Sequence, residues 1–349
     1  MSEPISAGSP LEPQRFAVGR RSALVVDDQR DGRVLAIDCW FPACSPSSED
    51  RVAAARSVYE LLPGVGFTAS ALSEAEPLAG EWPLILWSHG RTGTRSAYVM
   101  LCEGLAARGN VVVSCDHPGD TLLDWMMGAA VDDVTNETQR CDDVAFVLDG
   151  ALGVHDGCAE LLEGISVDGR RVAIAGHSYG GNTALRYASR VETDSRVHAI
   201  AGLQSFTRTI PRADLGRVSI PTLLIAGARD VTCPVDTDAD RAFAAIMSSR
   251  DVCCVVIAAA GHQACSDVGL YKELAPHVPN LPEMVVDYLS GMGSEVTGDA
   301  DDPWRPCVAL HLELLGTWLN ETLSGESAPR TFDTISQGPG ISRSLRRTL

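Results

Sequence analysis

One serine in the stretch AIAGHSYGGN, residues 174–183, has the surroundings of a nucleophile. Ser178 lies in the pattern Gly-x-Ser-x-Gly, between Gly176 and Gly180, after an apolar run and before a helical pattern. A serine on such a strand-to-helix turn has strained backbone angles, and glycine neighbours relieve the crowding there. The helix that follows directs the positive end of its dipole at the serine. The pattern therefore predicts a nucleophile at Ser178 rather than a purely structural turn.

A serine hydroxyl is a weak nucleophile at neutral pH and needs a base within hydrogen-bond reach. Asp230 ends the apolar run PTLLIAGARD, and His262 follows the next one, DVCCVVIAAAG. In the chain order Ser, Asp, His, the histidine would take the serine proton and the aspartate would orient the imidazole. The predicted catalytic residues are therefore Ser178, Asp230 and His262.

The segment SHGRTG, residues 88–93, follows another apolar run, WPLILW. The oxyanion of a tetrahedral intermediate needs two preorganised N–H donors. We assign them to the backbone of Arg91 and of Tyr179, the residue after the nucleophile. We expect His89 to order this loop and His177 to be a buried, hydrogen-bonded residue behind the serine.

Short apolar runs alternate with helical patterns along most of the chain. This alternation predicts an α/β fold with a mostly parallel sheet and helices on both faces. The first two runs, SALVVDD and RVLAIDCWFPA, are expected to be antiparallel strands. In parallel sheets the functional residues lie just beyond the carboxyl ends of the strands, where the three predicted catalytic residues fall.

We predict one folded domain over residues 16–324, with a flexible segment at 1–15 and a disordered tail at 325–349 because both ends are polar. The connection 266–310 is long, so it forms either a small cap over the site or loose surface structure. Trp125 and Met126 follow another predicted strand and either line a substrate pocket or pack in the core. His117, in DHPGD, either lines the site or is a satisfied loop histidine.

Composition excludes several classes of function. The formal charge of −18 repels nucleic acids and anionic membranes. No apolar stretch reaches the length of a membrane span, and the N-terminal residues lack the pattern of a secretory signal. The eleven cysteines include no CxxC pair, so we expect a reduced, cytoplasmic protein that binds no metal.

Several motifs together resemble a known family. IDCWFPA, SHGRTGTRSAY, VVSCDHPGD, DDVAFVLDG, GHSYGG and GHQACSD, over roughly residues 30 to 320, are similar to α/β-hydrolases. The closest resemblance is to the group of platelet-activating-factor acetylhydrolases, dienelactone hydrolase-like proteins and bacterial cutinases. The resemblance implies an α/β-hydrolase fold and serine-dependent hydrolysis of carboxylic esters without a cofactor.

The chain departs from this resemblance at two positions. Gln204 stands where the acetylhydrolase branch carries its acid, so Asp230 matches the cutinase position instead. Arg91 stands where an apolar or aromatic residue is common. Its guanidinium either grips an anionic group of the substrate or pairs with one of the many acidic residues.

The expected partner is a small-molecule ester, and the sequence leaves the oligomeric state open. The same catalytic residues also fit an acyltransferase, a thioesterase or a cyclising enzyme, in which another nucleophile replaces water. A binding protein on a hydrolase scaffold is a third interpretation, which the loss of a predicted catalytic residue would have favoured.

Overall fold

The computed structural model describes residues 5–8, 11, 15–45, 55–62, 65–278, 281, 283–297, 304–324 and 330–349. Within these residues, twelve strands join into one sheet in the order β1-β5-β2-β3-β7-β6-β8-β9-β10-β11-β12, and β4 pairs with β5. The strands are β1 (Ile5–Ser6), β2 (Ala17–Asp27), β3 (Arg33–Ala43), β4 (Arg56–Leu62), β5 (Val65–Leu72), β6 (Glu81–Ser88), β7 (Val111–Cys115), β8 (Ser166–His177), β9 (Ala199–Leu203), β10 (Thr222–Gly227), β11 (Asp251–Ile257) and β12 (Ile341–Thr348).

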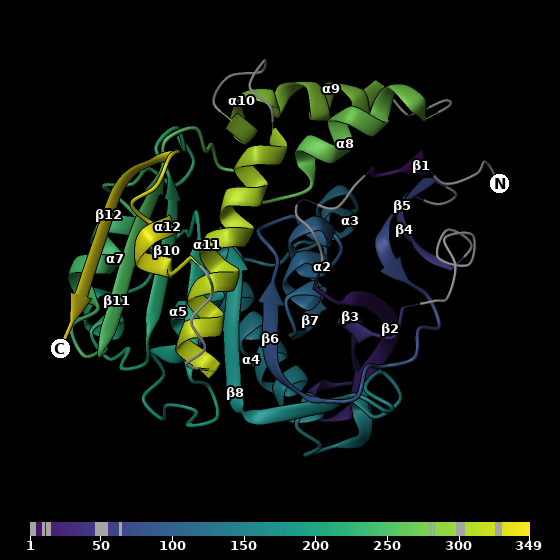
Figure 1. Cartoon of the computed structure of the whole chain (residues 1–349), viewed down its shortest axis with the longest axis horizontal. Coiled ribbons are helices and arrows are strands. Elements are labelled where there is room, and N and C mark those ends of the chain that lie inside the picture. Colours follow the sequence, from purple (N-terminus) through teal and green to yellow (C-terminus); the bar gives the residue numbers. More distant parts are fainter. Residues whose placement is uncertain are drawn as a thin grey trace.

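The centre of the sheet, from β7 to β11, is parallel throughout. As predicted, β2 and β3 are antiparallel, and β12 also pairs antiparallel, with β11. Successive side chains of β6 enter opposite cores: Ile85 belongs to one, and Leu84 and Leu86 belong to the other. Such two-sided burial is the reason that central parallel strands are continuous apolar runs. The predicted mostly parallel sheet is therefore confirmed (Figure 1).

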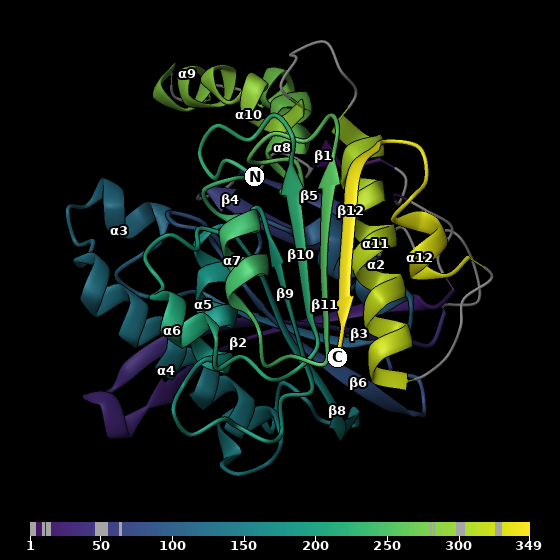
Figure 2. The same cartoon turned by 90° about the vertical axis from the view of Figure 1, so that its left-hand side faces the viewer.

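Helices cover both faces of the sheet, as predicted (Figure 2). Helices α2 and α11 pack on one face through residues such as Leu101 and Leu312, whereas α4 and α5 pack on the other through Val144 and Leu185. None of the described helices has the length and apolar character needed to cross a membrane. The helices are α2 (Val99–Ala107), α3 (Leu122–Met126), α4 (Asp133–Ala151), α5 (Tyr179–Ala188), α6 (Arg212–Leu215), α7 (Ala239–Ala245), α8 (Val268–Leu274), α9 (Glu283–Gly291), α10 (Gly293–Thr297), α11 (Trp304–Ser324) and α12 (Phe332–Ile335), with short 3-10 turns η1 (Asp28–Arg30), η2 (Asp156–Cys158) and η3 (Ala275–His277).

The long connection before α11 contains three helices, α8, α9 and α10. They lie beyond the carboxyl ends of β10 and β11 in both views (Figures 1 and 2). The loop after β11 is attached to α10, because Gly261 N donates to Val296 O at 3.0 Å and Gln263 N donates to Glu295 O at 2.5 Å. The described part of 266–310 is thus helical and contacts the loop that carries His262, and its role as a cap stays a prediction.

Both chain ends are more ordered than their polar composition suggested. Ile5–Ser6 pair with β5, and the side chain of Ala7 is buried. Residues 325–329 of the expected tail lie outside the described residues, but α12 and β12 follow them. The expectation of a disordered tail is therefore wrong for 332–348. The physical reason is that β12 forms backbone hydrogen bonds along the edge of β11, which requires few apolar side chains.

Candidate active site

Ser178 occupies a sharp turn between β8 and α5. Its φ of 55° and ψ of −113° belong to a region that non-glycine residues rarely adopt. A Cβ on Gly180 would lie 1.9 Å from the carbonyl oxygen of Ser88, and one on Gly176 would lie 2.5 Å from the carbonyl carbon of Gly180. Glycine is therefore required on both sides of the serine, for the reason expected from the Gly-x-Ser-x-Gly pattern.

The structure brings the side chains of Ser178, His262 and Asp230 into one chain of hydrogen bonds. Ser178 Oγ lies 3.0 Å from His262 Nε2, and His262 Nδ1 lies 2.9 Å from Asp230 Oδ2. Because a carboxylate only accepts hydrogen bonds, Nδ1 carries the proton and Nε2 presents its lone pair to the serine hydroxyl. All three residues are buried, with exposed fractions of 8% for Ser178 and 5% for the other two.

The Asp230 carboxylate is fixed by its own loop. The backbone N–H groups of Thr232 and Cys233 donate to Asp230 Oδ1 at 2.9 and 2.7 Å, so only Oδ2 faces the imidazole. Asp230 and His262 follow the neighbouring parallel strands β10 and β11. Their meeting at one edge of the sheet is thus a consequence of strand order.

His177 links the serine turn to two other parts of the site. Its Nε2 lies 2.7 Å from the carbonyl oxygen of His262, and its Nδ1 lies 2.7 Å from Tyr98 Oη, which accepts from Gly90 N at 3.0 Å. Burial, together with the neighbouring His262, holds the pKa of His177 well below the ordinary histidine value. His177 is therefore a neutral, hydrogen-bonded residue behind the nucleophile, as predicted.

The loop after β6 passes close to the nucleophile. A Cβ on Gly90 would lie 3.3 Å from Ser178 Cβ, so the two segments are in close contact. In this loop Gly90 N donates to Tyr98 Oη, and Thr92 N donates to Asp120 O at 3.1 Å. The intervening N–H of Arg91 has no acceptor among the described residues, which leaves it able to bind an oxyanion.

Arg140 is a residue that the sequence reasoning missed. Its fully buried guanidinium donates to the carbonyl oxygens of His89 and Gly90 at 2.8 and 3.2 Å and to Asp120 Oδ2 at 2.9 Å. Arg140 thus holds the carbonyl of the peptide group that contains the Arg91 N–H, and the carbonyl of the peptide group before it. A signal was present, because Arg140 shares the apolar stripe of α4 with Val144, four residues later, and an arginine there needs buried acceptors.

The contacts of His117 favour the structural one of its two predicted roles, and its role in the substrate pocket stays a prediction. Its side chain is fully buried, with Nε2 2.9 Å from Ser88 Oγ and Nδ1 3.0 Å from Asp143. Burial and the charge of Arg140 lower its pKa to about 4, so the ring is neutral. Both ring nitrogens are occupied, which makes His117 a satisfied loop histidine rather than a free donor for substrate. His89 orders the loop as expected, because its Nδ1 lies 2.7 Å from Gly90 O.

Trp125 and Met126 lie on the surface of α3, with exposed fractions of 63% and 53%. The interpretation of these side chains as core residues is therefore wrong. Helix α3 begins with a capping box between Thr121 and Asp124, so the sequence TLLD fixes the start of the helix but leaves its apolar side chains outside. A role of Trp125 and Met126 in a substrate pocket stays a prediction.

The guanidinium of Arg91 is paired within the protein. It donates to Asp133, lies 3.7 Å from Asp120 and sits over the ring of Tyr179 at 5.2 Å. These contacts favour the second of its two predicted roles, pairing with acidic residues, over recognition of an anionic substrate.

Gln204 is buried, and its Nε2 lies 2.8 Å from His311 Nε2. It thus belongs to a separate contact and not to the Asp230–His262 pair.

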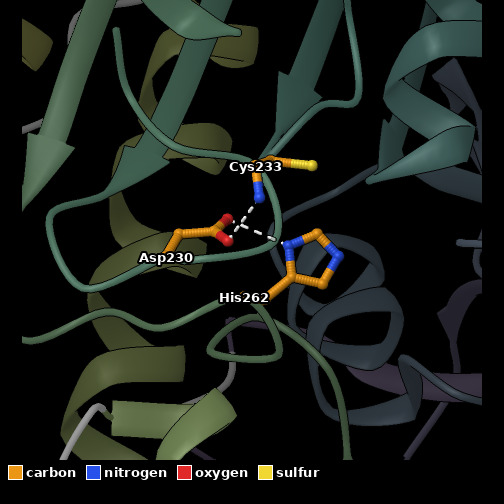
Figure 3. A group of neighbouring side chains, drawn as sticks. All are labelled: Asp230, Cys233 and His262. Atoms are coloured by element: carbon orange, nitrogen blue, oxygen red, sulfur yellow. Dashed lines mark hydrogen bonds and ion pairs between the residues drawn. The ribbon is translucent and has the colours of Figure 1, made fainter. Parts of the chain in front are cut away.

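Cys233 is the third member of the one group of described residues whose positions suit a metal ion. The candidate ligand atoms of Asp230, Cys233 and His262 all lie within 4.8 Å of one another. The three side chains come from the loops after β10 and β11 (Figure 3). Two of these residues belong to the hydrogen-bonded chain described above, so the cluster is contiguous with that chain.

The chain is similar to two known families and to a solved structure. Residues 129–273 match the PET hydrolase-like family, and residues 53–124 match the platelet-activating factor acetylhydrolase, isoform II, family. A ferulic acid esterase from Streptomyces cinnamoneus superimposes with a TM-score of 0.69 over 93% of this chain and 95% of that one, at 22% identity. This structural likeness establishes the fold.

Relatives of similar sequence include two cutinases. Cutinase est1 of Thermobifida alba is 29% identical over 47% of this chain, and Cutinase 1 of Thermobifida cellulosilytica is 28% identical over 55%. A probable 1-alkyl-2-acetylglycerophosphocholine esterase of Arthroderma benhamiae is 27% identical over 34% of this chain and 30% of its own length. The matched segments span 48% and 61% of the two cutinases.

The sheet order, the strand–serine–helix turn and the structural match define an α/β-hydrolase fold. In sequence, the chain is similar to PET hydrolase-like proteins, cutinases and a platelet-activating-factor acetylhydrolase family, so the resemblance seen in the sequence motifs is confirmed.

Proposed function

We propose that this chain is a carboxylic ester hydrolase with the catalytic triad Ser178, His262 and Asp230. The observation that carries the proposal is the pair of hydrogen bonds, 3.0 Å and 2.9 Å long, that joins the three side chains in that order. The names of the relatives support the reaction class, because they describe cutinases and esterases. The substrate is a small-molecule ester.

In the first half-reaction, Ser178 Oγ attacks the ester carbonyl carbon while its proton passes to His262 Nε2. Asp230 stabilises the imidazolium that forms, and the proton then goes to the departing alcohol. The developing oxyanion accepts hydrogen bonds from the N–H groups of Arg91 and Tyr179. The amino-terminal end of α5 adds a positive field at the same place.

In the second half-reaction, His262 takes a proton from water, and the resulting hydroxide attacks the acyl-enzyme. The same oxyanion donors serve this step, and collapse of the intermediate returns the proton to Ser178.

Cytoplasmic location remains our prediction, supported by the absence of any disulfide among the eleven described cysteines.

The test is hydrolysis of p-nitrophenyl esters of increasing acyl length, with matched amide and thioester substrates. Ser178→Ala should reduce ester turnover to less than a few per cent and abolish labelling by a fluorophosphonate, while leaving the circular dichroism spectrum unchanged. Ser205→Ala is the matched control, because Ser205 is also buried but has no hydrogen-bond partner among the described residues.

Turnover retained by Ser178→Ala would refute the triad. Product analysis in the presence of added alcohols and amines would identify the acyl acceptor. Exclusive acyl transfer to an added nucleophile, with no hydrolysis, would replace the proposed hydrolase by an acyltransferase.

A further inference from the structure

A thiol that the proposed reaction does not use lies against the catalytic base. Cys233 is buried beside the triad, and the hydroxyl of Ser178 is close enough to lower the pKa of its thiol. Figure 3 shows the sulfur on the imidazole side of the cluster, whereas the backbone N–H of Cys233 points to Asp230. The backbone of Cys233 therefore supports the acid, but its side chain has no part in the mechanism.

The thiol of Cys233 is unsuited to act as a nucleophile. Burial, and then the negative charges of Asp230 and Asp238, raise its pKa far above the ordinary cysteine value, and this outweighs the effect of Ser178. The free protein therefore holds a neutral thiol at this position. Moreover, Nε2 of His262 is already engaged with Ser178 Oγ, so the base is directed at the serine.

The same three side chains offer the ligand set of a thiophilic metal ion. One sulfur, one imidazole nitrogen and one carboxylate oxygen lie within 4.8 Å of one another, and each of these groups is a zinc ligand. Hard cations such as Mg²⁺ and Ca²⁺ prefer oxygen ligands only, so this set selects against them. Three protein ligands leave a fourth position of a tetrahedral site for water.

We propose that Cys233, His262 and Asp230 bind a thiophilic divalent cation, Zn²⁺ or Cd²⁺, and that this cation reversibly inhibits the hydrolase. Coordination releases the thiol proton to solvent, as is usual for metal-bound cysteine. A neutral imidazole has one nitrogen lone pair available for a proton or a metal ion. The cation occupies that lone pair of His262 and binds a carboxylate oxygen of Asp230. His262 then cannot accept the serine proton, so the site is inhibitory. The inhibition rests on the proposed function, whereas the binding does not.

Binding is tested without turnover in Ser178→Ala, which retains all three ligands. Protein freed of metal with EDTA is titrated with Cd²⁺, and the ultraviolet absorption of the cadmium–thiolate bond is measured. We expect saturation at one equivalent. The additional substitution Cys233→Ala should remove the absorption, whereas Cys44→Ser should keep it, because Cys44 is exposed and outside the cluster. Cys233→Ser provides a second variant of nearly native size, and circular dichroism checks the fold of both.

Inhibition is tested with Zn²⁺ in otherwise native protein, and each variant is compared with its own metal-free rate. Zn²⁺ should inhibit ester hydrolysis, EDTA should restore it, and Mg²⁺ should have no effect. Cys233→Ala should raise the inhibition constant by more than about tenfold, since even the loss of a residue that only hydrogen-bonds to a metal ligand weakens metal sites that much. Equal inhibition of Cys233→Ala and the native protein would overturn the proposal, as would cadmium–thiolate absorption that survives the loss of Cys233. An inactive native protein that still binds Cd²⁺ would refute the proposed hydrolysis and not the metal site.

Discussion

Replacement of Arg140 by lysine should slow ester hydrolysis through the oxyanion site, although Arg140 contacts neither Ser178 nor His262. The guanidinium holds Gly90 O at 3.2 Å and His89 O at 2.8 Å. In a planar trans peptide, the Gly90 carbonyl and the Arg91 N–H point in opposite directions. By fixing the carbonyl, Arg140 therefore fixes the direction of the N–H that we assign to the oxyanion.

The size of the effect follows from these contacts. Lysine preserves the positive charge beside Asp120, but its compact ammonium cannot reproduce the fork that serves both carbonyls. Complete loss of one oxyanion donor reduces kcat by about 10²–10³, so Arg140→Lys should reduce it by roughly 10 to 10³ with little change in KM. Each charged hydrogen bond that is not replaced should also lower the free energy of unfolding by about 1.5–3 kcal/mol.

The assay measures kcat and KM with a p-nitrophenyl ester, together with unfolding in urea. The midpoint of the pH–rate profile should not move, because the Asp230–His262 pair is untouched. Arg190→Lys is the control: Arg190 also pairs with an α4 residue, Asp142, but at the surface, and its replacement should leave both quantities unchanged. A kcat for Arg140→Lys within twofold of the native value, despite lower stability, would show that Arg140 supports the fold and not the oxyanion donor.

Three other predictions test the acid, the arginine at the site and the buried histidines. Asp230→Asn should reduce kcat by about 10⁴, whereas Gln204→Ala should change kcat little. The reverse result would mean that the acid of the triad lies near Gln204 and not at Asp230. Arg91→Leu should affect a neutral ester and a matched anionic ester equally, because its guanidinium pairs with Asp133; a selective loss on the anionic ester would contradict that pairing. Burial lowers the pKa of His311 to about 4. Between about pH 6.5 and 4 the unfolded chain therefore binds more protons than the native one at this histidine. Acidification over that range should lower the free energy of unfolding by up to about 1.4 kcal/mol per pH unit. Urea unfolding at several pH values should show that the free energy of unfolding of His311→Gln depends less steeply on pH than that of the native protein. An unchanged dependence on pH would exclude this contribution.

The parallel sheet and the approach of the three predicted catalytic residues were accessible from sequence because both depend on local patterns. The apolar run of β8 and the glycines around Ser178 specify a strand and a sharp turn. Strand order then brings Asp230 and His262 to the same edge. Their catalytic roles remain predictions that the kinetic experiments above address.

Contacts between distant segments were not accessible in the same way. The two acceptors that Arg140 binds at the end of β6 are about 50 residues away along the chain, and no local pattern announces such a contact. The hairpin of β4 and β5 was also missed: Phe67, Ala69 and Ala71 alternate with polar residues in β5, but β4 has no such alternation. The exposure of Trp125 contradicts only the core interpretation, since an apolar residue type does not show what covers its side chain, and the pocket role stays a prediction.

The strand β12 has a consequence for self-association. It covers the edge of β11, and no strand in the described part of the chain pairs with its other edge. An unpaired edge offers backbone groups to the sheet of a second molecule, and natural proteins block such growth with charged side chains. Here Arg343 pairs with Asp240, and Arg346 pairs with Asp251 and Asp333, so ion pairs line the strand. The residues that were expected to form a disordered tail therefore form a charged border that discourages edge-to-edge aggregation of an otherwise acidic protein.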